Sequence, residues 1–258
     1  AQDDDAGEYA AEGTAAHELA ARVLKNKKSR AEDWIGTKIA VGKREFEVTD
    51  EFADHVQTYV DDVQRRALGG YLMVEQRVSL AGVEGFDASN HGTSDAVMAV
   101  PYLVGGKHSY SYGVVEDLKF GQGEKVYAWE YAKDDAPFTM DMAEGDEVVS
   151  VVPHYQLMMY ALACLAYISL LVEAIRGITI VINQPRLGMV SELWVPIAVL
   201  ERFGVFAADA LYKAKNAKAL GVADVERKAD KYLNPGEKQC RWCKALARCP
   251  AAAKRAEE

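Results

Sequence analysis

Two neighbouring apolar segments of strand length each carry an acidic residue, and this pairing constrains the fold more than any other feature of the chain. Asp95 precedes the run Ala-Val-Met-Ala-Val, and Asp117 ends the run Gly-Val-Val-Glu-Asp. Apolar runs of this length are typical of buried strands. Because a charged group on a buried strand costs desolvation free energy, two such groups indicate a site.

The second segment ends in the triplet Asp117-Leu118-Lys119. Since side chains alternate along a strand, Asp117 and Lys119 share one face, Leu118 points into the core, and Glu116 points away from the triplet's charges. Such a triplet alone is weak evidence, because charged residues commonly solvate a strand edge. If the strand lies beside that of Asp95, two carboxylates and a lysine converge. That set suits a divalent cation and an attacking water beside a phosphodiester.

The order of the expected elements favours an α/β fold with a mixed central sheet flanked by helices. Helical spacing is found over residues 8–25, and a second helix is expected from a cap at Thr49 or Asp50 to about residue 68. Three successive strands, at 71–80 and around each of the two acids, are expected to form a meander. Residues 121–145 lack periodicity and predict a long loop. An apolar helix within 151–174, strands at 177–182 and 192–195 with a turn around 184–188, and a helix from 197 to about 220 complete the pattern.

The length of 258 residues suits one large domain, expected over residues 1–235, with a small segment, residues 236–258, packed on it. The net charge of −9 opposes a simple nucleic-acid binder. Basic residues nevertheless cluster within 22–30, 213–218 and 238–248, which leaves open either a basic groove or solvated helix faces. Because the sequence shows neither a long apolar run nor a signal-peptide pattern, we expect a cytoplasmic protein that does not enter the membrane.

Two helices add polar residues to the candidate site. His17 follows Gly13-Thr14 in an otherwise helix-favouring run. A lone histidine is more often structural, but the loss of helix propensity before it invites a functional explanation, and imidazole is a competent manganese ligand. Gln156 and Tyr160 stand four residues apart on one helix face, where they can hydrogen-bond a lysine, a metal-bound water or a phosphate.

Together the motifs Gly-Thr-x-x-His, Gly-x-x-Asp, Asp-x-Lys and Gln-x-x-x-Tyr resemble the RecB-like branch of the PD-(D/E)XK nuclease superfamily, over residues 13–160. The resemblance implies a restriction-endonuclease-like core and a Mg²⁺ or Mn²⁺ site. The implied metal ligands are His17, Asp95, Asp117 and the backbone carbonyl of Leu118. Lys119 is implied as the catalytic lysine, and Gln156 and Tyr160 as residues that orient DNA or the lysine.

Three cysteines near the carboxyl end, Cys240, Cys243 and Cys249, have a spacing that suits metal ligation better than disulfides. Structural zinc would need a fourth ligand. In the iron–sulfur members of the RecB-like branch, such as the AddB nuclease domain and the CRISPR-associated exonucleases, a similar triplet joins one upstream cysteine and implies a 4Fe–4S cluster. Here Cys164 reads as a small core residue. We therefore expect the fourth cysteine before Ala1, ahead of a poorly structured acidic start, with zinc as a substitute ion.

These features predict a divalent-metal-dependent deoxyribonuclease. The resemblance implies an exonuclease of DNA recombination or repair, of a kind carried by phages and prophages, with DNA and recombination proteins as partners. We expect Lys119 to orient the attacking water and stabilise charge, because the neighbouring carboxylates oppose its deprotonation. Two alternatives stay open: a catalytically silent DNA-binding or accessory protein on the same fold, and a zinc-bearing partner-binding module. The oligomeric state, the polarity of cleavage and the choice between exonuclease and endonuclease action also stay open.

Overall fold

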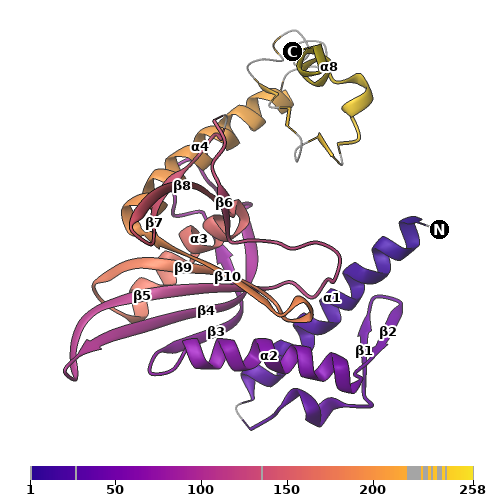
Figure 1. Ribbon diagram of the computed structural model, residues 1–258, viewed down its shortest axis with the longest axis vertical. Helices are drawn as coiled ribbons and strands as arrows, with labels where there is room; N and C mark the ends of the chain where they lie inside the picture. The colour runs from indigo at the N-terminus through magenta and orange to yellow at the C-terminus, as the bar shows by residue number, and fades with distance from the viewer. Residues whose placement is uncertain are drawn as a thin grey trace. The chain divides into compact units, whose positions relative to one another are not determined.

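The structure, a computed structural model, describes two compact units of the chain (Figure 1). One unit contains residues 1–83 and 87–204, and the other contains residues 84–86 and 205–258. The described residues are 2–26, 28–134, 136–219, 228, 232–233, 235–236, 240–241 and 243–257. Among them, no helix combines the length and apolar composition that crossing a bilayer requires. The packing of residues 236–258 on the larger domain stays a prediction.

A mixed five-stranded sheet forms the centre of the first unit, which confirms the predicted α/β class. Its strands lie in the order β10-β9-β5-β4-β3, and the β5–β9 pair is parallel whereas the other pairs are antiparallel. The predicted meander is therefore present as β3, β4 and β5. The strands are β3 (Tyr71–Ser79), β4 (His91–Val104), β5 (Lys107–Leu118), β9 (Ile175–Gln184) and β10 (Met189–Pro196).

Three helices cover this sheet. The helices α1 (Gln2–Lys25) and α2 (Asp50–Arg66) share one buried cluster with Val114 of β5, whereas a side chain on the neighbouring Gly113 would meet Ile168 of α3 (Tyr155–Leu171). Since adjacent residues of a strand face opposite ways, α3 covers the other face of the sheet. Figure 1 shows α2 running along the face below β3 and β4.

The helix ends confirm two expectations and correct one. The Oγ1 atom of Thr49 accepts a hydrogen bond from the Phe52 amide at 3.2 Å, so Thr49 is the cap of α2. The chain is helical from Gln2, which makes the expected irregular start wrong. The helix α3 begins at Tyr155, inside the predicted range 151–174, and follows a strand that ends at Pro153.

The expected long loop at residues 121–145 is wrong in part. It contains β6 (Trp129–Tyr131) and β7 (Met140–Glu144), and both pair with β8 (Glu147–Pro153) in a second sheet of order β6-β8-β7. Strands of three and five residues are too short for their periodicity to be read, and they are stabilised by pairing with β8. A hairpin of β1 (Lys38–Val41) and β2 (Arg44–Glu47) also escaped prediction.

The remaining elements complete the two units. The predicted turn after β9 is η2 (Pro185–Leu187), which ends at Gly188 with a φ of 57°. The predicted helix from residue 197 is α4 (Ile197–Ala219), and the boundary between the two units falls within it. The other short elements are η1 (Ala31–Trp34), η3 (Leu246–Arg248) and α8 (Pro250–Glu257).

Candidate active site

The β4–β5 register brings the two predicted acids together. Ala96 pairs with Glu116 in antiparallel strands. One step back along β4 is Asp95 and one step forward along β5 is Asp117, so the two acids lie opposite one another. The Asp95 Oδ2 atom accepts a hydrogen bond from the Leu118 amide at 2.8 Å. This bond fixes the Asp95 carboxylate against the end of β5.

Lys119 completes the predicted trio. Its Nζ atom lies 2.8 Å from the Asp117 Oδ2 atom, and the Leu118 side chain between them is only 1% exposed. The alternation predicted for the triplet is therefore present. The backbone amide of Lys119 donates a hydrogen bond to the Asn183 carbonyl at 2.9 Å, so the lysine is anchored to β9 as well.

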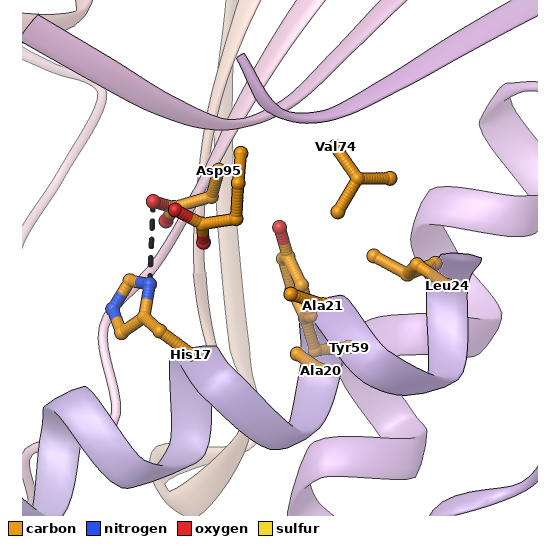
Figure 2. A pocket seen from close by; sticks show the side chains of 8 residues that line it. His17, Ala20, Ala21, Leu24, Tyr59, Val74 and Asp95 are labelled. Atoms are coloured by element: carbon orange, nitrogen blue, oxygen red, sulfur yellow. Dashed lines mark ion pairs between the residues drawn. The ribbon is translucent and has the colours of Figure 1, made fainter. Parts of the chain in front are cut away.

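His17 reaches the same acids from α1. Its Nδ1 atom lies 3.2 Å from the Asp95 Oδ1 atom (Figure 2). The two oxygens of Asp95 thus have different partners, an imidazole and a backbone amide. Four of the predicted site residues, His17, Asp95, Asp117 and Lys119, therefore lie together.

The charges of this group favour a bound cation. Burial alone would lower the pKa of His17, but the hydrogen bond and charge of Asp95, together with the charges of Asp117 and Glu75, raise that pKa. Burial and then the charge of Asp95 raise the pKa of Asp117, against the opposing effect of Lys119. The two carboxylates therefore repel each other in a site with little solvent. A divalent cation between them would relieve that repulsion, so the donor set fits one.

Glu75 of β3 also belongs to the site, and the sequence analysis missed it. Ligand atoms of His17, Glu75 and Asp95 all lie within 4.8 Å of one another, the one such group of three or more among the described residues. Glu75 has a φ of 53°, whereas its neighbours Val74 and Gln76 pair regularly with β4. A left-handed glutamate inside a strand has no signature in local sequence, since that conformation disfavours most side chains.

A cavity of about 410 Å³ opens beside Lys119 and His17. On α1 it is lined by the Gly13-Thr14 pair of the first motif, and no atom lies within 4 Å of the place where a Cβ on Gly13 would stand. The volume is within the usual range for ligand sites. Its other lining residues are Ala10, Leu118, Phe120, Gly121, Glu124, Val126 and Gln184.

The predicted pair on α3 lies farther along β4. The Gln156 Nε2 atom donates to the Tyr160 hydroxyl at 3.2 Å, and the Tyr160 ring packs on Gly92, where an added Cβ would lie 2.8 Å from Cε1. Gly92 stands three residues before Asp95. Among the described residues, no hydrogen bond joins Gln156 or Tyr160 to Lys119, and the hydrogen bond of the pair is internal.

Glu116 lies apart from the trio, as strand alternation predicted. It accepts a hydrogen bond from the Asn183 Nδ2 atom at 2.9 Å, and the Arg66 Nε atom lies 3.6 Å from its Oε2 atom. Burial raises the pKa of Glu116 to about 8. This carboxyl therefore belongs to a buried polar network that includes α2.

Within the described residues, the cysteines form no ligand group of the kind found around His17. Cys240 and Cys249 are half-buried and Cys243 is exposed. Among the described residues, the sulfur atoms of these three cysteines do not all lie within 4.8 Å of one another. Cys164 is fully buried and burial raises its pKa to about 12, in keeping with the core role predicted for it. The predicted fourth cysteine, before Ala1, lies outside the described residues.

Comparison with known proteins adds a family and no activity. Residues 1–258 match the family model described as "Protein of unknown function (DUF2800)", so the match spans the chain. No solved structure matches it.

Proposed function

The chain belongs to the DUF2800 family, and we propose that it is a divalent-metal-dependent deoxyribonuclease. One observation carries the proposal: His17, Asp95, Asp117 and Lys119 come from three separate elements and meet beside an open cavity. These are four of the residues that a RecB-like nuclease would need. All four are present, which favours an active enzyme over a silent DNA-binding protein.

In the proposed reaction, His17, Asp95, Asp117 and the Leu118 carbonyl hold a Mg²⁺ or Mn²⁺ ion. The bound ion would polarise the scissile phosphate and lower the pKa of a water molecule. Each protein group has a fixed task. The Leu118 amide holds the Asp95 carboxylate in place, and Asp95 in turn fixes the ring of His17.

Lys119 stabilises the charge that develops on the phosphate. Its ammonium pairs with Asp117 at 2.8 Å and lines the cavity, where a phosphodiester would enter. Because this ammonium is already held by the Asp117 carboxylate, we assign Lys119 orientation of the water and electrostatic stabilisation, and no proton abstraction.

The finer assignment rests on the sequence resemblance. We propose a cytoplasmic exonuclease of DNA recombination or repair, with Gln156 and Tyr160 orienting DNA. For Cys240, Cys243 and Cys249 we propose a 4Fe–4S cluster completed by a further cysteine, or zinc in its place. The partners proposed are DNA and recombination proteins.

A cleavage assay on matched lysine variants tests the proposal. Lys119→Met removes the ammonium at the end of β5, and Lys107→Met makes the same change at the exposed start of that strand, about 40 Å away at roughly 3.3 Å per residue. With end-labelled linear and circular DNA and Mn²⁺ or Mg²⁺, we expect Lys119→Met to cleave at least about 100-fold more slowly. Lys107→Met should cleave like the wild type, and circular dichroism should show both variants folded.

Three outcomes would contradict the proposal in different ways. Metal-dependent cleavage retained by a folded Lys119→Met variant would remove the lysine from the mechanism. Wild-type protein that binds DNA and never cleaves it would point to the silent binding protein. Protein without any DNA affinity would favour the partner-binding module.

A further inference from the structure

The sheet face that α1 and α2 cover is open at the end away from the candidate active site. Arg66, the last residue of α2, reaches Glu116 and Glu192 with its guanidinium. Farther along the strands, Tyr102 of β4 and Trp194 of β10 are 44% and 41% exposed. Figure 1 shows the β4–β5 hairpin extending beyond the end of α2. This end of the sheet therefore presents aromatic side chains to solvent.

Strand pairing puts these aromatic residues on one face. Tyr102 pairs with Tyr110, and every second residue of β5 shares the face of Tyr110 as far as Val114, which belongs to the cluster buried under α1 and α2. Val114 pairs with Thr179 of β9, and Thr179 pairs with Trp194. The strands β4, β5, β9 and β10 therefore contribute to a single surface.

A bulge in β9 adds an arginine to this surface. The register of β9 against β5 shifts at Tyr112, where two residues of β9, Arg176 and Gly177, stand opposite one residue of β5. A bulge re-aims a side chain that regular pairing would send to the other face. The Arg176 guanidinium accordingly lies over the Tyr110 ring, 4.4 Å from its centroid. A Cβ on Gly177 would lie 2.6 Å from the Trp194 ring, so this ring packs on the bulge.

The side chains at this bulge form a stack of planar groups. The Tyr102 and Tyr110 rings are stacked, with centroids 4.6 Å apart and an angle of 23° between their planes, and Arg176 lies over Tyr110. Nucleic-acid bases stack on aromatic rings and on guanidinium planes. A single strand offers its base faces for such contacts, whereas a duplex covers them with neighbouring pairs. We call this surface the aromatic face; its residues are Tyr102, Tyr110, Arg176 and Trp194.

The local charge suits a polyanion, although the whole chain is acidic. The chain has 39 acidic residues, and none of them lies between residues 96 and 115, the greater part of the β4–β5 hairpin. Glu192, the acid of β10 on this face, is paired with Arg66 at 2.8 Å. The charge of Arg176 is therefore available to a phosphate beside the stacked rings.

We infer that the aromatic face binds single-stranded DNA, with bases stacked on Tyr102 and Trp194 and a phosphate held by Arg176. Tyr110 stands seven residues before Asp117 on β5, about 23 Å away at roughly 3.3 Å per residue, so this surface is separate from the candidate active site. The inference rests on the proposed function only in choosing DNA as the strand, and its binding is measurable without cleavage.

Fluorescence anisotropy of a labelled strand of about 20 thymidine nucleotides, titrated with the full chain in EDTA, tests the inference. A strand of the same length built from abasic nucleotides keeps the phosphates and removes the bases. Because stacking needs bases, we expect the wild type to bind the thymidine strand more tightly than the abasic strand.

Matched variants locate the binding. Tyr102→Ala should weaken binding of the thymidine strand at least about fivefold, the lower end of the effect of losing one stacked base, and leave binding of the abasic strand unchanged. Tyr71→Ala is the control: this exposed tyrosine of β3 pairs with Ala99, which pairs with Gly113 on the face covered by α3. Arg176→Met should reduce the slope of log affinity against log salt by about 0.7, the value for one phosphate contact on a single strand.

The outcomes separate this inference from the nuclease proposal. Equal affinity of the wild type for both strands, or a folded Tyr102→Ala variant that binds thymidine like the wild type, would overturn the aromatic face as a DNA site, whether or not the protein cleaves DNA. Tighter binding of a uridine strand would overturn the choice of DNA. A wild type that binds through this face and never cleaves with Mn²⁺ would overturn the proposed activity alone. If Tyr102→Ala fails to fold, an unchanged salt slope in Arg176→Met would overturn the inference.

Discussion

Replacing Glu116 by glutamine should reduce the loss of stability that the first unit undergoes as the pH rises. Glu116 is fully buried, and burial raises its pKa from 4.5 to about 8 against the opposing effect of the Asn183 hydrogen bond. Between these two values the folded chain holds a proton that the unfolded chain lacks, so the free energy of unfolding falls as the pH rises. At about 1.4 kcal/mol per pH unit, the loss across this interval is about 5 kcal/mol as an upper bound.

Glutamine keeps the shape of the side chain and cannot ionise. Its carbonyl still accepts from Asn183, and Arg66 keeps Asp62 and Glu192, each at 2.8 Å. Urea unfolding followed by tryptophan fluorescence should give similar stability for wild type and variant near pH 5. Near pH 8.5 the variant should be more stable by several kcal/mol.

A matched control uses the exposed partner of the same arginine. Glu192→Gln removes a charge that is 56% exposed, so we expect it to leave the wild-type pH profile nearly unchanged. If Glu116→Gln lost stability with rising pH in parallel with the wild type, the carboxyl would not hold its proton, and the reasoning from burial would be refuted.

Two further predictions concern local packing. Thr49→Ala should lower the free energy of unfolding by about 1 kcal/mol in the same urea assay, because it removes the 3.2 Å cap to the Phe52 amide; no change would mean that α2 is capped otherwise. Gly113→Ala should destabilise by about 1–3 kcal/mol, since the new Cβ would lie 2.6 Å from the Ile168 Cδ1 atom. Gly13→Ala is its control: the helical site has open space and should gain up to about 1 kcal/mol, and equal effects of the two changes would contradict the packing argument.

The parts of the site that follow from strand alternation could be predicted. Once β5 was recognised, Asp117 and Lys119 had to share a face, Leu118 had to enter the core, and Glu116 had to face elsewhere. The meander then placed Asp95 opposite Asp117, because consecutive antiparallel strands usually pair. These expectations needed only neighbouring residues and short connections.

Other parts depend on tertiary structure and have no local signature. Glu75 joins the site through a left-handed backbone, which its sequence neighbours do not predict. The strands β6 and β7 exist because β8 pairs with both of them. The placement of Tyr160 against Gly92 required the position of α3 on the sheet, which helix periodicity leaves undetermined.

The parallel pairing of β5 with β9 sets an order in which the site can assemble during folding. Asp95 and Asp117 lie on adjacent strands of one hairpin, so a short loop closure brings them together. The bond from the Lys119 amide to the Asn183 carbonyl joins segments separated by residues 120–182, and such distant contacts form slowly. We therefore expect the acidic half of the site to assemble first, and the backbone of Lys119 to be fixed only when β9 pairs with β5. A nascent chain that ends before Ile175 would carry the carboxylates without the strand that holds their lysine.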